Sequence, residues 1–224
     1  MDTIVDGIER FFLDVIGYVL PGLTLLVGGW LILGHPTRFG SIDIFPLAEG
    51  TGVVGLVTIS YLLGYPIIAV GEIVLDWLMS RVPRIQSRRD IEEKVHSDPL
   101  FEIAVEQLKN TFESLEKVPC ESASVRWWRG IAISAIHGQS QVIYRFTAIA
   151  QLNLGVATAL FIVTIFSIFV GRQPLSERLG VVIPLLVLGI LFLNRHQEFY
   201  RRSITLPFSM FLVQDIKKGD EKID

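Results

Sequence analysis

The sequence predicts an all-α membrane protein with four transmembrane helices, a helical cytoplasmic insert between the second and third, and an N-in/C-in topology. Half of the 224 residues are apolar and 19% are charged, against about 25% charged residues in soluble domains; the mean hydropathy is +0.50. Four windows are apolar enough to cross about 30 Å of hydrocarbon at about 1.5 Å per helical residue. They are 11–33, 52–77, 146–170 and, more narrowly, 179–193.

The basic residues set the predicted topology, because Lys and Arg are enriched on the cytoplasmic side of membrane proteins. The two loops assigned to the outside hold only Arg38, Arg172 and Arg178, which leaves 17 of the 20 Lys and Arg residues on the inside. Four regions follow. They are 1–79, with an N-terminal interfacial turn and two spans; a cytoplasmic helical region, 80–145; two further spans in 146–194; and a cytoplasmic amphipathic tail, 195–224.

The cytoplasmic region has a helical pattern of its own. Ser97 or Asp98 as N-cap, with Pro99 in the first turn, is a typical helix start. The predicted apolar face, at three- and four-residue spacing, consists of Leu100, Ala104, Leu108, Phe112 and Leu115, widened by Phe101 and Val105. This face needs a partner, either another copy of the chain or a second cytoplasmic helix, predicted to begin near Ser122 or Ser124 and to run toward the third span.

Aromatic and basic residues mark predicted membrane-interface positions. Trp77 ends the second span, and Trp127 and Trp128 lie between two arginines, as is typical of that interface. The alternative is that the two tryptophans cover a small helical core. Arg88 and Arg89 belong to a basic run for which anionic lipid headgroups are the favoured partner. Nucleic acid is disfavoured, since no recognition pattern accompanies the run.

The fourth span and the tail are predicted as separate elements. The window 179–193 covers only about 22 Å at helical rise, so it needs local bilayer thinning or snorkelling of Arg178 and Arg195. The tail has an amphipathic pattern that favours a position along the inner membrane surface or on the cytoplasmic helices. Pro207 is expected to break or kink it.

Small residues indicate where the spans pack against other helices. Ser60 and Gly64 have small-x-x-x-small spacing in the second span, as Gly155 and Ala159 have in the third. This spacing lets helix backbones approach closely, and it favours bundle packing or oligomerisation without separating the two. Polar residues of the third span are expected to form interhelical hydrogen bonds: Gln151, Asn153, Thr158, Thr164 and Ser167.

Glu72 and Asp76 form the candidate intramembrane polar site. They lie four residues apart on one helical face, with Asp76 at the headgroups and Glu72 about one turn deeper. Arg145 and Arg195 are the candidate positive partners at similar depth. Because intramembrane carboxylates are costly, they are functional candidates. A structural ion pair is favoured for Glu72, ahead of a polar lining of a pore or ligand pocket and of proton coupling.

The sequence lacks catalytic and metal-binding spacings. His35, His96, His137 and His196 are scattered, without the short spacing of metal ligands. Cys120 is the single cysteine, so no internal disulfide is available. Phosphate-binding, dinucleotide-binding and G-x-S-x-G motifs are missing as well. We therefore expect a non-enzymatic protein with no cofactor and no bound metal.

The first span carries an aspartate, a tyrosine and Pro-Gly, and the second carries Tyr-x-x-Gly. These residues are Asp14, Tyr18, Pro21, Gly22, Tyr61 and Gly64. With the helical insert and the closing "RHQEFYRRSITLPF", the layout resembles a group of small multi-pass prokaryotic membrane proteins. A histidine often stands in that group where this chain has Tyr65. Most members are uncharacterised, and some are similar to membrane components of anti-phage defence operons.

The resemblance implies an effector or sensor in the prokaryotic cytoplasmic (inner) membrane, with a role in antiviral defence. Its cytoplasmic helices would receive a signal from a soluble protein partner, and we expect the chain to form a homo-oligomer within the lipid bilayer. Two alternatives stay open: a small channel or transporter subunit, and a passive membrane anchor of a complex.

Overall fold

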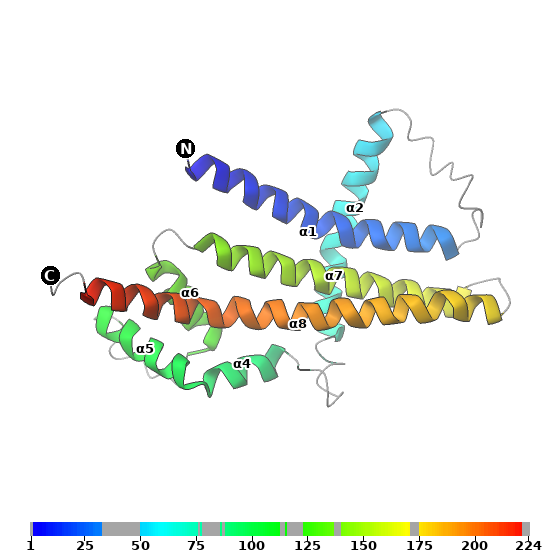
Figure 1. Cartoon of the computed structure of the whole chain (residues 1–224). Helices are drawn as coiled ribbons and strands as arrows, with labels where there is room; N and C mark the ends of the chain where they lie inside the picture. The colour runs from blue at the N-terminus through cyan, green and yellow to red at the C-terminus, as the bar shows by residue number, and fades with distance from the viewer. Residues whose placement is uncertain are drawn as a thin grey trace. The chain divides into compact units, whose positions relative to one another are not determined.

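The structure is a computed structural model that describes residues 2–32, 50–75, 77, 86, 88–112, 115, 123–136, 140–170 and 175–220. Within these residues every regular element is a helix (Figure 1), which confirms the all-α class. In chain order the elements are α1 (Asp2–Ile32), α2 (Gly50–Val70), the π-helical turn η1 (Gly71–Leu75), α4 (Arg88–His96), α5 (Pro99–Thr111), α6 (Val125–Ala135), α7 (Ser140–Val170) and α8 (Leu175–Asp220).

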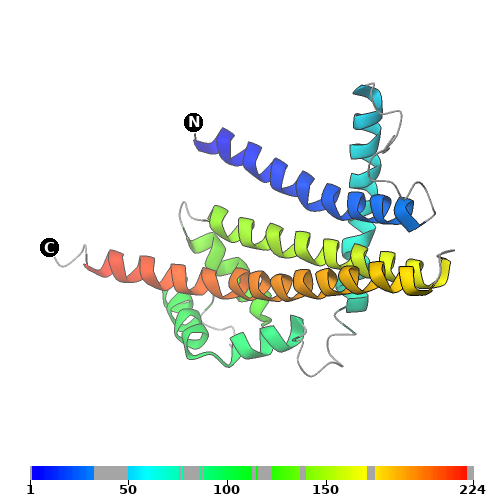
Figure 2. The same ribbon diagram turned by 45° about the vertical axis from the view of Figure 1, so that its right-hand side comes forward.

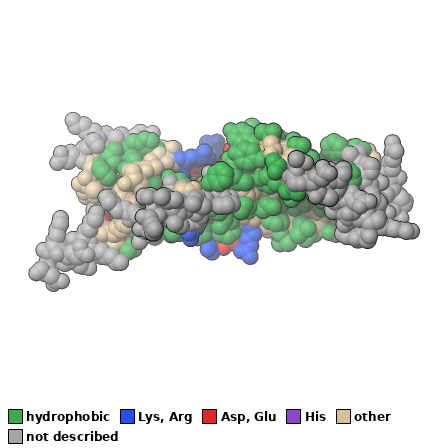
Figure 3. All heavy atoms as spheres, turned by 90° about the horizontal axis from the view of Figure 1, so that it is seen from above, with side chains coloured by type: hydrophobic (Ala, Val, Ile, Leu, Met, Phe, Trp, Pro, Cys, Tyr) green, Lys and Arg blue, Asp and Glu red, His purple; other side chains and the backbone are tan. Residues whose placement is uncertain are grey.

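Three helical stretches of the described chain are long and apolar enough to cross a membrane: Gly52–Val74, Gln141–Val170 and Leu179–Ile216. The first predicted span lies in α1, where Val15–Trp30 is a shorter apolar stretch. Many of the apolar side chains are exposed, and Figure 3 shows such side chains gathered on one face. The structure therefore supports membrane association. A membrane crossing by α1, which would bring the number of spans to four, and the N-in/C-in topology stay predictions.

The chain forms two compact units. Unit 1 comprises Met1–Leu78 and Ala148–His196, and unit 2 comprises Met79–Thr147 and Gln197–Asp224. Because α7 and α8 both continue past these boundaries, the same two helices contribute to both units. In unit 1 they lie side by side in both views (Figures 1 and 2), and Gly189 of α8 faces the ring of Phe161 of α7.

Glycines in unit 1 allow α1, α2 and α7 to approach closely. A Cβ atom at Gly22 would lie 1.8 Å from the carbonyl oxygen of Ser60, and one at Gly64 would lie 1.8 Å from that of Tyr18. At Gly155 of α7 it would lie 2.6 Å from Cγ of Pro21. Such contacts leave room only for a hydrogen atom. This is expected in lipid, where no hydrophobic driving force joins helices and small residues let their backbones approach closely.

The polar side chains of α7 bond within their own helix. Asn153 Nδ2 donates to the Ile149 carbonyl over 2.7 Å, and the hydroxyls of Thr158 and Thr164 donate to carbonyls four residues earlier over 2.8 Å. The expectation of interhelical hydrogen bonds was wrong for these three residues. A backbone carbonyl of the same helix is always within reach of such side chains, so no partner helix is needed.

Unit 2 has a hydrophobic core built by α4, α5, α6 and the parts of α7 and α8 that belong to it. The N-caps of α5 and α6 are Asp98 and Ser124, within the predicted pairs of residues. The buried face of α5 consists of Phe101, Ala104, Val105 and Leu108. All four belong to the predicted face, but that face also included Leu100, at 54% exposure, and the exposed Phe112, so it was predicted too wide.

The second cytoplasmic helix is shorter than expected. α6 ends at Ala135, where the backbone N–H of Ile136 donates to the Ala132 carbonyl, and α7 begins separately at Ser140. Ala132 and Ile136 are both buried in the core of unit 2. The partner of α5 is therefore found within the same chain, in α6 and α8.

The fourth predicted span and the tail lie in one helix, because α8 continues from Leu175 to Asp220 through Pro207. A proline inside a helix has no N–H to donate to the carbonyl four residues earlier, here that of Ser203. Arg129 Nε of α6 donates to this carbonyl over 2.9 Å. The expected break at Pro207 was wrong, because another helix supplies the missing donor.

Candidate functional site

Glu72 lies in a π-helical turn. The turn, η1, follows α2 directly, within the apolar stretch Gly52–Val74. A Cβ atom at Gly71 would lie 2.3 Å from Oγ1 of Thr158 in α7, so the turn packs closely on that helix. The Glu72 side chain is half-buried. Single π turns in α-helices are frequent at functional sites, which makes this carboxylate the candidate site of unit 1.

The structure does not decide the predicted ion pair of Glu72. Asp76 lies outside the described residues. Arg195 is exposed on α8 in unit 1, whereas Arg145 is exposed on α7 in unit 2. Pairing of Glu72 with either arginine therefore stays a prediction.

Three tyrosines lie together beside the crossing of α1 and α2. The ring of Tyr18 is 5.4 Å from that of Tyr61, edge to face, and 5.7 Å from that of Tyr65. Tyr61 and Tyr65 are 41% and 66% exposed. Tyr65 thus contributes an aromatic contact to α1.

Unit 2 contains a polar network that joins three helices. Glu92 Oε1 of α4 accepts a hydrogen bond from Arg126 Nε of α6 over 2.6 Å and one from the Tyr200 hydroxyl of α8 over 2.7 Å. Arg126 Nη2 donates to the same hydroxyl over 3.3 Å, and the Arg88 guanidinium lies 5.1 Å from the centre of the Tyr200 ring. Partial burial lowers the pKa of Arg126, but the interactions with Glu92 and Tyr200 outweigh it and leave that pKa raised.

Arg129 joins α6 to α7 and α8 through neutral acceptors. Its Nη2 donates to the Thr147 hydroxyl over 2.9 Å, and its Nε donates to the Ser203 carbonyl. Burial, together with the nearby charge of Arg126, lowers the pKa of Arg129 from its usual value. The residue positions helices, and the only sign of this role in the sequence is an arginine inside the second predicted cytoplasmic helix.

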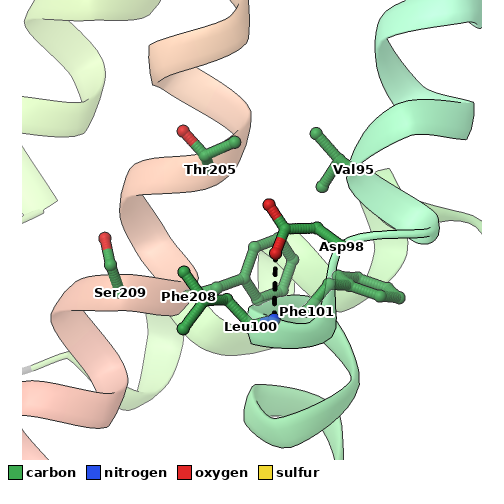
Figure 4. A pocket seen from close by; sticks show the side chains of 7 residues that line it. All are labelled: Val95, Asp98, Leu100, Phe101, Thr205, Phe208 and Ser209. Carbon is green, nitrogen blue, oxygen red and sulfur yellow. Dashed lines mark hydrogen bonds between the residues drawn. The ribbon is translucent and has the colours of Figure 1, made fainter.

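A pocket of about 200 Å³ lies between α4, α5 and α8 in unit 2 (Figure 4). Its polar side chains are Asp98, Thr205 and Ser209. Asp98 Oδ1 accepts from the Leu100 N–H, and the two hydroxyls donate to carbonyls of α8. Since these groups are already bonded locally and the remaining lining is apolar, the pocket has little to orient a polar ligand.

The predicted interface residues differ in their surroundings. Trp128 is fully buried (0% exposed) in the core of unit 2, with Lys109 Nζ 5.7 Å from its ring centre. For this residue the alternative prediction, a place in a helical core, is confirmed. Trp77 and Trp127 are exposed. Arg89 forms an exposed pair with Glu93 at 3.2 Å. Membrane-interface roles for these exposed residues, as for Arg88, stay predictions.

His196 is a residue whose contact the sequence did not predict. It is buried on α8, and its Nδ1 lies 2.7 Å from the carbonyl oxygen of Ala150 on α7. Within the described residues, no group of three His, Cys, Asp or Glu side chains is arranged to hold a metal ion. The histidine therefore acts as a polar contact between two helices of unit 1.

No family model, curated protein or solved structure matches the chain.

Proposed function

We propose that the chain is an integral membrane effector or sensor, with four spans, both termini in the cytoplasm, and unit 2 as the cytoplasmic part that receives a signal from a soluble partner. The observation that carries the proposal is that α7 and α8 each contribute to both units. A helix shared by two packed units transmits a packing change in one to the other, because close-packed interiors shift between discrete arrangements.

The length of α8 supports this role. Its 46 residues extend about 69 Å at helical rise, more than twice the roughly 30 Å of hydrocarbon. Its C-terminal part contributes Ile204, Phe208 and Phe211 to the core of unit 2. A partner that repacks this core would act on the same helix that packs in unit 1.

Coupling between the units is testable before any partner is known. In a Cys120→Ser background, Val27→Cys would carry an environment-sensitive probe on an exposed position of α1. Ala132→Leu overpacks a fully buried position of α6, whereas Ser134→Leu changes an exposed position of the same helix. We expect only Ala132→Leu to change the probe signal. An unchanged signal, in a chain that remains folded, would favour the passive anchor.

The effector role has a separate test in cells that express the full chain with the genes beside it. A membrane-potential dye should report depolarisation when the partner system is activated, and Phe208→Ala, which empties part of the unit 2 core, should abolish it. If activation leaves the potential unchanged in the unmodified chain, the effector role is contradicted.

A second candidate function, a small channel or transporter subunit, is favoured by Glu72. A half-buried carboxylate in the π turn of a membrane-length helix is a costly feature that is common along ion pathways. Glu72→Gln should reduce cation or proton flux into proteoliposomes, while Glu72→Asp should retain part of it. Glu102→Gln, at an exposed position of α5, is the control. Equal flux in the wild-type protein and all three variants would show that Glu72 has only a structural role.

A further inference from the structure

The side chains of Tyr61 and Tyr65 are exposed in the middle of a membrane-length helix. Both residues lie in the 23-residue stretch Gly52–Val74, each nine residues, or about 13 Å, from its nearer end. That is farther than a tyrosine side chain extends, and tyrosines in membrane helices are normally found near the ends, where the hydroxyl meets water. Lipid headgroups therefore cannot hydrate these two hydroxyls.

Within the described part of the chain, the contacts of Tyr61 and Tyr65 are ring contacts with Tyr18, and neither hydroxyl forms a hydrogen bond. A hydroxyl left without a partner in hydrocarbon is costly. The side chains are nevertheless 41% and 66% exposed. Something other than lipid must cover them in the membrane.

The two tyrosines share one side of α2. They are four residues apart, or about 40° around the helix axis, and Glu72, eleven residues from Tyr61, continues the same side at about 20°. The exposed Val54 and Val57 extend this side toward the start of α2. On the other sides, the large exposed residues of the stretch are apolar, including Ile59, Leu62, Val70 and Ile73. The polar side is thus a single stripe, hereafter the tyrosine face (Tyr61, Tyr65 and Glu72).

We propose that the tyrosine face is the surface through which a second copy of the chain binds. A tyrosine hydroxyl is both a donor and an acceptor, so two identical faces complement each other across a two-fold axis, as an isologous interface requires. Copies inserted with the same topology bring the same depths together, so that each Tyr61 and Tyr65 meets its counterpart. Polar groups of this kind hold helices together in lipid, where apolar contact gives no preference over lipid tails.

Cysteine cross-linking in native membranes tests the interface. In the Cys120→Ser background, Tyr61→Cys and Tyr65→Cys should each give a disulfide-linked dimer on mild oxidation. Ile59→Cys is the matched control, because this position is 52% exposed and lies at nearly the same depth, but about 160° around the helix from Tyr61. We expect at least a fivefold higher dimer yield at the two tyrosine positions.

Equal or higher cross-linking at Ile59 would overturn the proposal. A second measurement does not depend on cysteine variants: two differently tagged wild-type copies should co-purify in lipid nanodiscs, and the Tyr61→Phe/Tyr65→Phe pair should weaken this association about tenfold, the loss expected for two membrane hydrogen bonds. Wild-type copies that do not associate also overturn it. The flux assay on Glu72 is independent, so dimers without flux would refute the channel function and leave the interface intact.

Discussion

Arg129 donates a hydrogen bond from Nε to the carbonyl oxygen of Ser203 across 2.9 Å, and this carbonyl belongs to the helical turn that Pro207 leaves without a donor. The long helix α8 thus depends on a residue 74 positions earlier in the chain. The contact explains how a buried proline is accommodated in the core of unit 2.

Arg129→Ala should therefore destabilise the protein by about 1–3 kcal/mol, the range for leaving a buried acceptor unsatisfied. Thermal unfolding in detergent, followed by tryptophan fluorescence, measures the effect. The loss should shrink when Pro207→Ala restores the N–H of α8, and a double-mutant cycle reports this coupling. Additive effects of the two substitutions would show that Arg129 has another main role.

The second prediction concerns the crossing of α1 and α2. Gly64→Ala adds a methyl group at a position where a Cβ atom would lie 1.8 Å from the Tyr18 carbonyl oxygen, so the helices must separate. We expect a loss of about 1–3 kcal/mol, as for overpacked cores, in denaturant titrations of the reconstituted protein. Gly55→Ala, on the same helix with open space around it, should leave the stability unchanged or slightly raised.

The third prediction compares two adjacent glutamates of α4. Glu92 accepts hydrogen bonds from Arg126 and Tyr200, whereas Glu93 forms an exposed pair with Arg89. Glu92→Gln should lower the free energy of unfolding by about 1–2 kcal/mol, because charge-assisted hydrogen bonds are the stronger ones. Glu93→Gln should change it by less than about 0.5 kcal/mol. Similar losses for both variants would contradict a special role for the network.

The fourth prediction separates the adjacent tryptophans. Trp128→Ala opens a cavity in the core of unit 2 and should cost about 3–5 kcal/mol. Trp127→Ala should cost much less, because the side chain is exposed, and should instead reduce quenching of the protein's fluorescence by brominated lipids if Trp127 lies at the membrane interface. Unchanged quenching would leave Trp127 as a solvent-facing residue.

Local rules predicted the helix starts well. Asp98 and Ser124 were each one of two predicted N-cap candidates, because a capping side chain acts on backbone groups two or three residues away, as the bonds to Leu100 and Trp127 show. All four buried residues of α5 were in the predicted face, but Leu100 and Phe112 were included wrongly, because the limits of that face depend on where α6 and α8 lie. Three- and four-residue spacing describes a stripe, and it does not fix the direction of its partner.

Contacts between distant segments account for the other differences. Nothing near Pro207 in the sequence reveals that Arg129 donates to Ser203, so a break was the reasonable prediction. In the membrane helices, Ser60 and Gly64 were singled out by spacing alone, and the structure places both against the backbone of α1. The π turn at Glu72 has no sequence signal comparable to a cap or a proline.

The division of α7 and α8 between the two units bears on how the protein can be dissected. Unit 2 is discontinuous in the chain, so an excised segment 80–145 would lack Ile204, Phe208 and Phe211, which fill its core. Such a fragment should expose Trp128 and aggregate. A soluble version of unit 2 would instead need residues 197–216 joined back to the insert through a designed linker, and it would be the natural bait for testing whether the proposed soluble partner exists.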